Sequence, residues 1–281
     1  MLLITGATGN VGRPLIDELL TAGAKVRATS RTPQTANLPD RVEVVGSLAD
    51  PQSMADALTG VSAVFINPIA VAHGTEQLLA VAAECGVTRV VVLSSGAIRD
   101  DLADQLDPLA AWHQGIEAVV NASGIGRTFI RPFEFAANVS QQWAPQIRYT
   151  ATVREPYAEA TSAVIHERDV AAVAATALLS DGHEGCTYQV TGPRSHTRAE
   201  MAEILAGVLD RPIAFAETPR EDALQAMTQS GLPQPIAESV LTMRAMSVGR
   251  PAFVTDTVER ITGRAARTFA EWAGDHVADF A

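Results

Sequence analysis

Three glycines near the start of the chain have the spacing of a nucleotide-binding loop. Gly6, Gly9 and Gly12 lie in the run 6-GATGNVG-12, which follows an apolar segment and opens a stretch of helical periodicity. Glycines permit a tight turn and let backbone N–H groups approach a pyrophosphate, which then lies at the positive N-terminus of the helix. The spacing also occurs in plain turns, but the expected strand and helix on either side favour a dinucleotide site. The predicted cofactor contacts here are Gly6, Thr8, Gly9, Asn10, Val11 and Gly12.

The residues after the next apolar segment indicate which dinucleotide would bind. An NAD site usually has an acidic residue about 20 positions beyond the glycines, where it binds the 2′-hydroxyl of the ribose. This chain has 27-RATSR-31 at that point, with no carboxylate. Arg31 can bind a 2′-phosphate and Ser30 can donate a hydrogen bond to it, so we predict NADP(H) in preference to NAD(H). The alternative is that Arg31 is a solvated loop charge.

Three further segments place polar or turn residues directly after an apolar run. In an open α/β sheet, ligands bind outside the carboxyl ends of the strands. Taken singly, each segment is equally compatible with ordinary turn chemistry, but their placement after successive strands favours cofactor contact. The predicted contacts are Ser47 and Leu48 near the adenine, followed by Asn67, Pro68, Ser94 and Ser95.

These residues need a scaffold, and the hydrophobic pattern of the first 130 residues predicts one. Short helical stretches separate apolar runs at residues 1–5, 25–29, 42–45, 61–66, 89–93 and 127–130. Such alternation with short connections predicts an α/β fold, namely a Rossmann-type doubly wound parallel sheet. We assign residues 1–131 to this dinucleotide-binding domain.

The pattern changes after residue 131. It predicts a helix at 133–144, a strand at 149–154, a helix at 169–179 capped by Asp169, a helix from 197 to 209 capped by Thr197, and a final helix at 267–280. We expect residues 132–281 to form a smaller C-terminal α+β region that covers the substrate. Because no linker separates the two parts, they form one compact body in which the chain is free to cross back to the sheet.

Composition narrows the classes of partner. The formal net charge of −11 repels phosphate backbones and anionic lipid, so no nucleic acid and no membrane partner is expected. The two cysteines, Cys85 and Cys186, have no redox or zinc spacing, and no metal site is predicted. With no basic leader and no apolar run of transmembrane length, we expect a cytoplasmic protein. The oligomeric state stays open.

Several of these motifs together resemble those of atypical short-chain dehydrogenases. The glycine loop, Arg31, 94-SSG-96 and 131-RPFEF-135 are most similar to the NmrA-like group, which includes quinone reductase-like enzymes and a redox-sensing transcription regulator. The runs 163-AVIHERD-169 and 188-YQVTGP-193 also look like that group. The resemblance covers nearly the whole chain. It implies that the cofactor lies across the N-terminal sheet and that the C-terminal part covers the nicotinamide.

The chain departs from its relatives at the catalytic helix. Typical members carry a Tyr-x-x-x-Lys pair there, whereas this chain has 109-LAAWHQGIE-117. If Glu117 is aligned with the acidic residue that often follows the lysine by four, His113 takes the lysine position and Leu109 the tyrosine position. His113 is therefore predicted to bind the nicotinamide ribose, or to donate a proton with a pKa near neutrality. The alternative is an i,i+4 pair with Glu117 that only orients structure.

Residues beyond the sixth strand complete the predicted site. Pro132 and Phe133 are expected to contact the cofactor, and Phe135, Trp143 and Tyr157 the substrate. Ordinary core packing is the alternative for these aromatic residues. For His166, helix capping is the more economical interpretation.

Three functions fit the sequence. The leading one is an NADPH-dependent oxidoreductase that transfers a hydride to a planar, rather apolar quinone, enone or aromatic ketone. A quinone would tolerate the missing tyrosine, because its reduced oxyanion is delocalised. The alternatives are a non-catalytic NADP(H)-sensing regulator and a non-redox isomerase or cyclase on the same fold.

Overall fold

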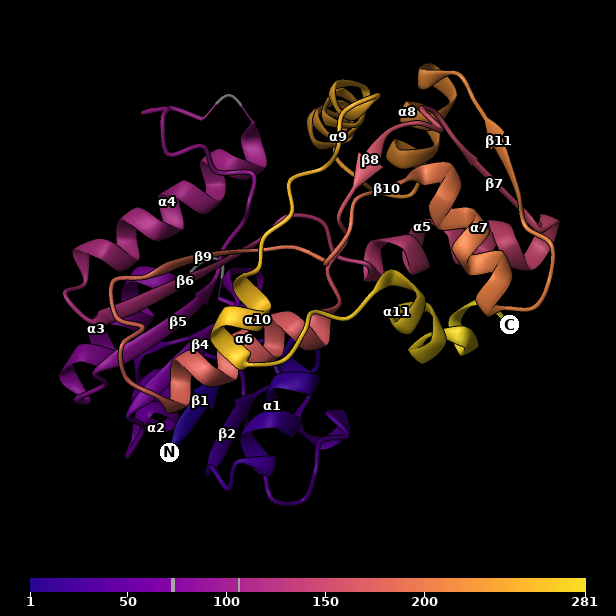
Figure 1. The fold of residues 1–281 in the computed structure, drawn as a ribbon. Helices are drawn as coiled ribbons and strands as arrows, with labels where there is room; N and C mark the ends of the chain where they lie inside the picture. The colour runs from indigo at the N-terminus through magenta and orange to yellow at the C-terminus, as the bar shows by residue number, and fades with distance from the viewer. Residues whose placement is uncertain (72–73, 106) are drawn as a thin grey trace.

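The main sheet of the protein has seven parallel strands in the order β3-β2-β1-β4-β5-β6-β9 (Figure 1). The computed structural model describes residues 1–71, 74–105 and 107–281. The strand order reverses between β1 and β4, as in other doubly wound sheets, and the predicted Rossmann-type α/β fold is confirmed. The strands of this sheet are β1 (Leu2–Ile4), β2 (Val26–Thr29), β3 (Glu43–Val45), β4 (Ala63–Ile66), β5 (Arg89–Leu93), β6 (Gly126–Pro132) and β9 (Thr187–Val190).

The central strands are apolar because both of their faces are covered. Every residue of β1 and β4 is buried. Along β1, Leu2 and Ile4 pack into one hydrophobic core, and Leu3 between them packs into a second core on the opposite face. A strand buried on both faces needs a continuous apolar run, and for that reason such runs located the strands in the sequence.

Helices cover the two faces in two groups. One core is shared with α1 (Gly12–Thr21), α6 (Glu167–Leu179) and α10 (Thr257–Thr262). The other core is shared with α2 (Pro51–Leu58), α3 (Thr75–Glu84) and α4 (Pro108–Ala122). The sequence pattern also predicts a helix from His73 to Cys85, and its predicted first residue, His73, lies outside the described residues.

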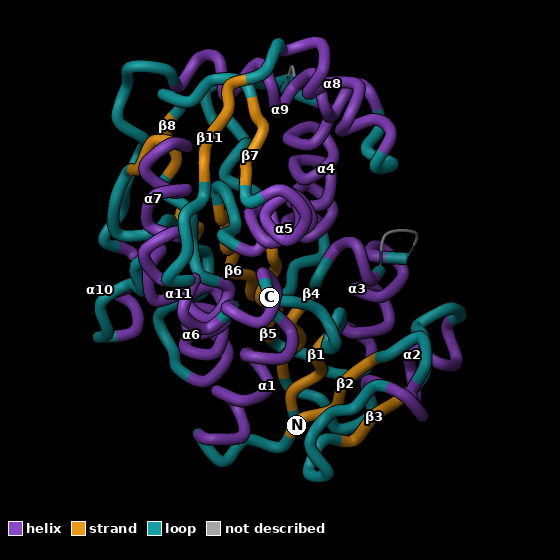
Figure 2. Tube along the Cα trace, turned by 90° about the vertical axis from the view of Figure 1, so that its right-hand side faces the viewer, coloured by secondary structure: helices purple, strands orange, loops and turns teal. Residues whose placement is uncertain are grey.

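The remaining elements form a second lobe with its own core. Trp143 and Trp272 are fully buried there, between α5 (Ala137–Thr150), α7 (Arg198–Val208) and α11 (Phe269–Asp275). Figure 2 shows the parallel pair β7 (Thr152–Glu155) and β11 (Ala214–Glu217) apart from the main sheet. The lobe also contains the antiparallel pair β8 (Thr161–Ser162) and β10 (His196–Thr197), with α8 (Arg220–Gln229) and α9 (Gln234–Ser247). The chain leaves the main sheet after β6 and returns to it with α6, β9 and α10.

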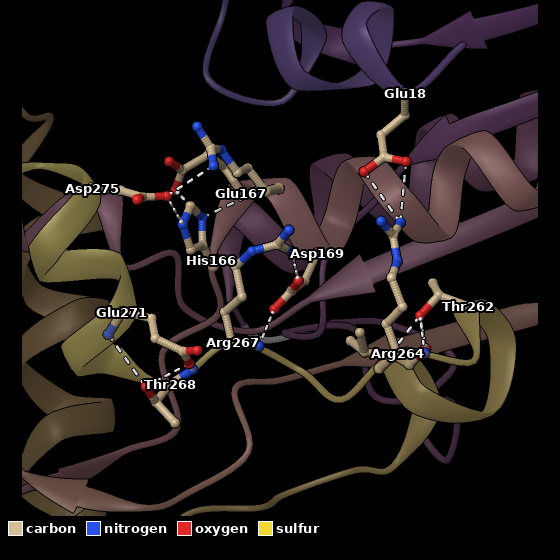
Figure 3. A network of polar contacts seen from close by, with 12 residues as sticks. Glu18, His166, Glu167, Asp169, Thr262, Arg264, Arg267, Thr268, Glu271 and Asp275 are labelled. Carbon is tan, nitrogen blue, oxygen red and sulfur yellow. Dashed lines mark hydrogen bonds and ion pairs between the residues drawn. The ribbon is translucent and has the colours of Figure 1, made fainter. Parts of the chain in front are cut away.

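The last part of the chain ties the two lobes together (Figure 3). We call residues 256–281 the C-terminal clasp. Its α10 packs on α6, and its α11 packs in the core of the second lobe. Between these helices, the backbone N–H of Arg267 donates to the buried carboxylate of Asp169 at 2.7 Å, and the Arg267 guanidinium pairs with the same group. Further ion pairs join Arg264 to Glu18 at 3.1 Å, Asp275 to Arg168 at 3.0 Å and His276 to Glu167 at 2.9 Å.

Several predicted element ends were wrong. Helix α5 begins at Ala137, not at Phe133, and its last turn includes Tyr149, so β7 is shorter than expected. The final helix is α11 followed by a 3-10 turn at Val277–Phe280. Thr197 caps α7 as predicted, in a capping box with Glu200.

The predicted N-cap of α6 was also wrong. The cap is His166, whose Nδ1 accepts the backbone N–H of Arg168 at 3.2 Å. Asp169 lies in the first turn of the helix, and its carboxylate binds Arg267 of the C-terminal clasp. The capping role that the sequence favoured for His166 is therefore confirmed.

No helix in the described ranges 1–71, 74–105 and 107–281 has both the length and the apolar composition needed to cross a membrane.

Candidate functional site

The glycine loop between β1 and α1 is a close-packed turn at the topological switch of the sheet. Gly6 has a φ of +66°, a conformation that side chains disfavour, and its carbonyl accepts the N–H of Gly9 at 3.0 Å. A Cβ atom at Gly12 would lie 2.2 Å from the Gly6 carbonyl oxygen, and one at Gly6 would lie 2.7 Å from the Asn67 side chain. The first and third glycines thus bring α1 and the end of β4 against the loop.

The N-terminus of α1 presents free backbone donors beside this loop. Within the described residues, the N–H groups of Asn10, Val11 and Gly12 form no hydrogen bond. Thr8, Gly9 and Asn10 are exposed, and the first turn of the helix has no side-chain cap and no acidic residue. Unpaired donors at a helix N-terminus fit the pyrophosphate of a dinucleotide.

The end of β2 provides a basic side chain next to this anion site. Arg31 is exposed, and it forms no hydrogen bond or ion pair within the described ranges. The hydroxyl oxygen of Ser30 accepts the Thr32 N–H at 3.1 Å, which leaves its own proton available. The sequence analysis missed Arg13, whose guanidinium donates to the carbonyls of Ala36 and Asn37 at 2.9 and 2.8 Å. Arg13 therefore holds the loop after Arg31 against α1.

The predicted strand-end residues lie along the carboxyl edge of the sheet. Asn67 packs on Gly6, and its backbone N–H donates to Thr5 Oγ1 at 2.7 Å. Pro68 follows it and is buried. At the end of β3, Ser47 is exposed and Leu48 packs against the second hydrophobic core. Ser95 at the end of β5 accepts the Ala97 N–H at 3.2 Å.

A buried ion-pair network lies beneath the end of β5. The guanidinium of Arg131 donates to both carboxylate oxygens of Glu117 at 2.8 and 2.7 Å, and to Asp100 at 2.9 and 3.0 Å. The hydroxyl of Ser94 donates to the same Glu117 carboxylate at 2.5 Å. The hydrogen bonds to Glu117 raise the pKa of Arg131. Ser94 therefore serves this network, which fixes the ends of β5 and β6 relative to α4.

The sequence analysis missed this network. Both ends of the Arg131–Glu117 pair were visible, one in the run 131-RPFEF-135 and one as the residue used to align α4. Nothing in their local spacing shows that they meet, because the contact depends on how α4 packs on the sheet.

His113 lies one helical turn before Glu117, on α4. Burial lowers the pKa of its imidazole to about 4, against the weaker opposing effect of Glu117. The predicted pKa near neutrality was therefore wrong, and the ring is neutral at pH 7. Its Nδ1 atom is buried and has no hydrogen-bond partner among the described residues. The ring of Trp112 packs edge-on against the imidazole, and the two ring centroids are 4.6 Å apart. An orphaned ring nitrogen leaves the imidazole free to bind a ligand group. The carboxylate of Glu117 binds Arg131 and Ser94. The alternative interpretation, in which Glu117 pairs only with His113 one turn away, therefore does not describe this side of the helix.

Of the aromatic residues predicted to contact cofactor or substrate, some are exposed and others belong to the hydrophobic core. Phe133, after the end of β6, is 42% exposed, and Phe135 is partly buried against the first core. Trp143 is wholly buried in the second lobe, where the guanidinium of Arg198 lies 4.7 Å from its ring centroid. Its place in the core removes Trp143 from the proposed substrate wall. Tyr157 is partly buried, with a φ of 63°, and its N–H donates to Glu217 at 3.1 Å.

Two other features are not assigned to the cofactor site. His166, Glu167 and His276 place possible metal-ligand atoms within 4.8 Å of one another. His166 accepts the N–H that caps α6, and His276 of the C-terminal clasp pairs with Glu167, so both rings already have partners within the protein. A hollow of about 380 Å³ borders Met1, Lys25 and Arg41 at the amino ends of the strands. We do not assign it to the cofactor, since ligands of such sheets bind at the carboxyl ends.

Comparison with known proteins identifies the family of this chain and relatives that match its whole length. The sequence profile of a family described as NAD(P)H-binding matches residues 6–181. The chain is 39% identical over 285 residues to a (4-alkanoyl-5-oxo-2,5-dihydrofuran-3-yl)methyl phosphate reductase of Streptomyces griseus, covering 100% of this chain and 99% of that protein. It is 33% identical over 287 residues to an NAD(P)H azoreductase of Xenophilus azovorans, with coverage of 100% and 99%. A crystal structure of an NADPH-dependent quinone oxidoreductase from Escherichia coli has the same fold, with a TM-score of 0.80 at 24% identity, over 98% of this chain and 99% of that one.

Proposed function

This chain belongs to the NAD(P)H-binding family and is an oxidoreductase, and from that premise we propose that it reduces a planar, conjugated electrophile with NADPH. The observation that carries the proposal is the glycine loop at the β1–β4 switch, where neither the N–H groups at the start of α1 nor the Arg31 side chain, at the end of the neighbouring strand β2, has a partner among the described residues. The alternatives of an NADP(H) sensor and of a non-redox isomerase are left as outcomes of the test below.

The residues of the carboxyl edge have distinct roles in this proposal. The loop from Gly6 to Gly12 binds the pyrophosphate, and Arg31 with Ser30 binds the 2′-phosphate. Asn67, Ser95 and Phe133 line the path of the dinucleotide towards the nicotinamide. Phosphate recognition by a guanidinium is the physical basis of the preference for NADPH.

The chemistry of the site suits an electrophile that needs little acid assistance. When bound, NADPH supplies a hydride to an electron-poor carbon of the substrate, whose oxygen then takes up a proton. The position of the usual tyrosine is occupied by Leu109, which has no proton to give. His113 is neutral, so it offers a hydrogen bond and not the proton of an imidazolium. A conjugated system spreads the developing negative charge and tolerates this weaker donor, whereas an isolated ketone does not.

The names of the relatives support the same substrate class. The reductase that is 39% identical is named for an unsaturated, acylated lactone, and two further relatives are named for an azo compound and a quinone. All three contain a conjugated, electron-poor double bond. We propose an alkanoyl-substituted unsaturated lactone phosphate as the first substrate to try, because that relative matches the whole chain.

The test is the consumption of NADPH, followed by its absorbance, with menadione, an alkanoyl dihydrofuranone methyl phosphate, an azo dye and a simple aliphatic ketone as acceptors. We expect turnover with one or more of the conjugated acceptors, none with the ketone, and a preference for NADPH over NADH. Arg31→Ala should weaken NADPH binding about tenfold and spare NADH. Arg41→Ala, at an exposed arginine of the opposite edge, is the matched control.

Two outcomes would contradict the proposal. Equal losses for NADPH and NADH in Arg31→Ala would remove the 2′-phosphate assignment. Tight NADPH binding without turnover of any conjugated acceptor would favour the NADP(H) sensor or the non-redox isomerase.

A further inference from the structure

Two phenylalanines lie exposed and in contact where the sheet meets the second lobe. Phe133 is 42% exposed and Phe253 is 55% exposed, and their ring centroids are 5.4 Å apart. By contrast, Phe65, Phe129, Phe269 and Phe280 are each at most 3% exposed. Leaving two adjacent rings in water forgoes the hydrophobic stabilisation that the other rings obtain. Such a pair at a ligand-binding edge indicates a contact surface for an apolar ligand.

Phe133 connects the pair to the cofactor site. Its ring packs on Gly96, directly after Ser95 at the end of β5, and a Cβ atom at Gly96 would lie 2.6 Å from the ring. The N–H of Gly96 donates to the carbonyl of Pro132 at 2.8 Å. The aromatic pair therefore stands at the carboxyl edge of the sheet, where the reactive end of the dinucleotide is proposed to lie.

The backbone around Phe253 is fixed. This segment descends from α9 to α10 in Figure 1. The N–H of Ala252 donates to Ser195 Oγ at 2.8 Å, and the N–H of Thr255 donates to Thr191 Oγ1 at 2.9 Å. Thr255 also donates to the carbonyl of Gln189 in β9 at 3.2 Å. Because hydrogen bonds on both sides hold the segment to the end of β9, the exposed ring is not required as its anchor.

We propose that Phe253 determines substrate specificity, by packing with Phe133 against the planar conjugated ring of the electrophile. This inference rests on the proposed reductase function and adds a residue from the distant C-terminal half to its substrate site. Ring-on-ring packing is tolerant of the substituents on the ligand but requires it to be flat. Phe253 contributes to binding and makes no chemical contribution to hydride transfer.

The test compares Phe253→Ala, Phe253→Trp and the wild type. With menadione as acceptor, we expect Phe253→Ala to raise KM about tenfold, with kcat within about twofold and NADPH affinity unchanged. Phe253→Trp should restore a low KM, because it restores a flat aromatic surface. Tyr149→Ala is the matched control, since Tyr149 is an aromatic residue that is 87% exposed at the end of α5. An unchanged KM in Phe253→Ala would overturn the inference while leaving the reductase function in place.

A second measurement separates this inference from the function on which it rests. Calorimetric binding of menadione to the protein saturated with NADP⁺ requires no turnover. If the wild type reduces nothing but binds menadione, and Phe253→Ala binds it about tenfold more weakly, the proposed function fails and the aromatic site stands. If the wild type neither reduces nor binds planar acceptors, both are overturned.

Discussion

At the scale of single residues, the glycine loop depends on the missing side chains of its glycines. The Cβ atom of an alanine at position 12 would lie 2.2 Å from the Gly6 oxygen and 2.8 Å from the Ala7 Cα atom. These are backbone atoms, so the loop must open to make room. We expect Gly12→Ala to weaken NADPH binding at least tenfold, about 1.4 kcal/mol or more, measured by titration calorimetry.

The control for this change is Gly207→Ala. Gly207 lies in α7 with open space around its missing Cβ. Alanine there should leave NADPH binding unchanged and stabilise the helix by about 0.5–1 kcal/mol. Normal NADPH affinity in Gly12→Ala would show that the close approach of α1 to the loop is unnecessary.

His113 makes folding sensitive to acid. Its pKa falls from 6.5 to about 4 in the folded protein, because burial disfavours the charged ring. Between these pH values the unfolded chain binds a proton that the folded chain does not, so stability is complete above pH 6.5 and declines towards pH 4. The loss is at most about 3 kcal/mol, since the ring is not wholly buried.

Urea unfolding at a series of pH values measures this effect. We expect His113→Gln to show a shallower decline in stability than the wild type between pH 6.5 and 4. Parallel curves for the two proteins would mean that the imidazole is not desolvated.

Whether the role of a residue could be predicted depended on how far apart in the sequence its contacts lie. The glycine loop was predictable because a turn between a strand and a helix is a local feature. The role of Ser94 was not, since its hydroxyl donates to Glu117 across the interface between β5 and α4. Phe253 was missed for the same reason, because its partner Phe133 is remote in the sequence.

At the scale of elements, the first turn of α6 binds the segment of the C-terminal clasp that joins the two lobes. Asp169 is 1% exposed and holds both the backbone and the side chain of Arg267. We expect Asp169→Asn to destabilise the protein by about 2 kcal/mol, because Arg267, whose side chain is partly buried, loses its charged hydrogen-bond partner. Asp17→Asn, at an exposed aspartate on α1, should change stability by less than about 0.5 kcal/mol.

The measurement for this pair is equilibrium urea unfolding at neutral pH. Equal midpoints for Asp169→Asn and the wild type would show that the clasp does not depend on this contact. The role of Asp169 also differs from the predicted one, because His166 caps the helix instead. An aspartate before an apolar helix is typical of an N-cap, and only the packing of the distant clasp shows that this one binds Arg267.

At the scale of the whole molecule, the two lobes share their stability. The main sheet was predictable from its apolar runs, since its central strands are buried on both faces. The path of the chain between the lobes was not, because it depends on contacts that join residues remote in sequence. The C-terminal clasp places Val258 in the core of the sheet and Trp272 in the core of the second lobe.

We therefore expect a single cooperative unfolding transition. Far-ultraviolet circular dichroism reports all helices, while tryptophan fluorescence reports Trp112 on α4 and the two buried tryptophans of the second lobe. The two signals should change at the same urea concentration. Separate midpoints would show that the lobes unfold independently.

The clasp also bears on how the protein is made. Helix α6, strand β9 and helix α10 cover or extend a sheet whose first strand begins at Leu2. On the face that carries α1, the sheet therefore lacks part of its cover until α6 and then α10 have been synthesised. The nascent chain therefore exposes apolar surface of the sheet until these later helices have emerged and packed on it.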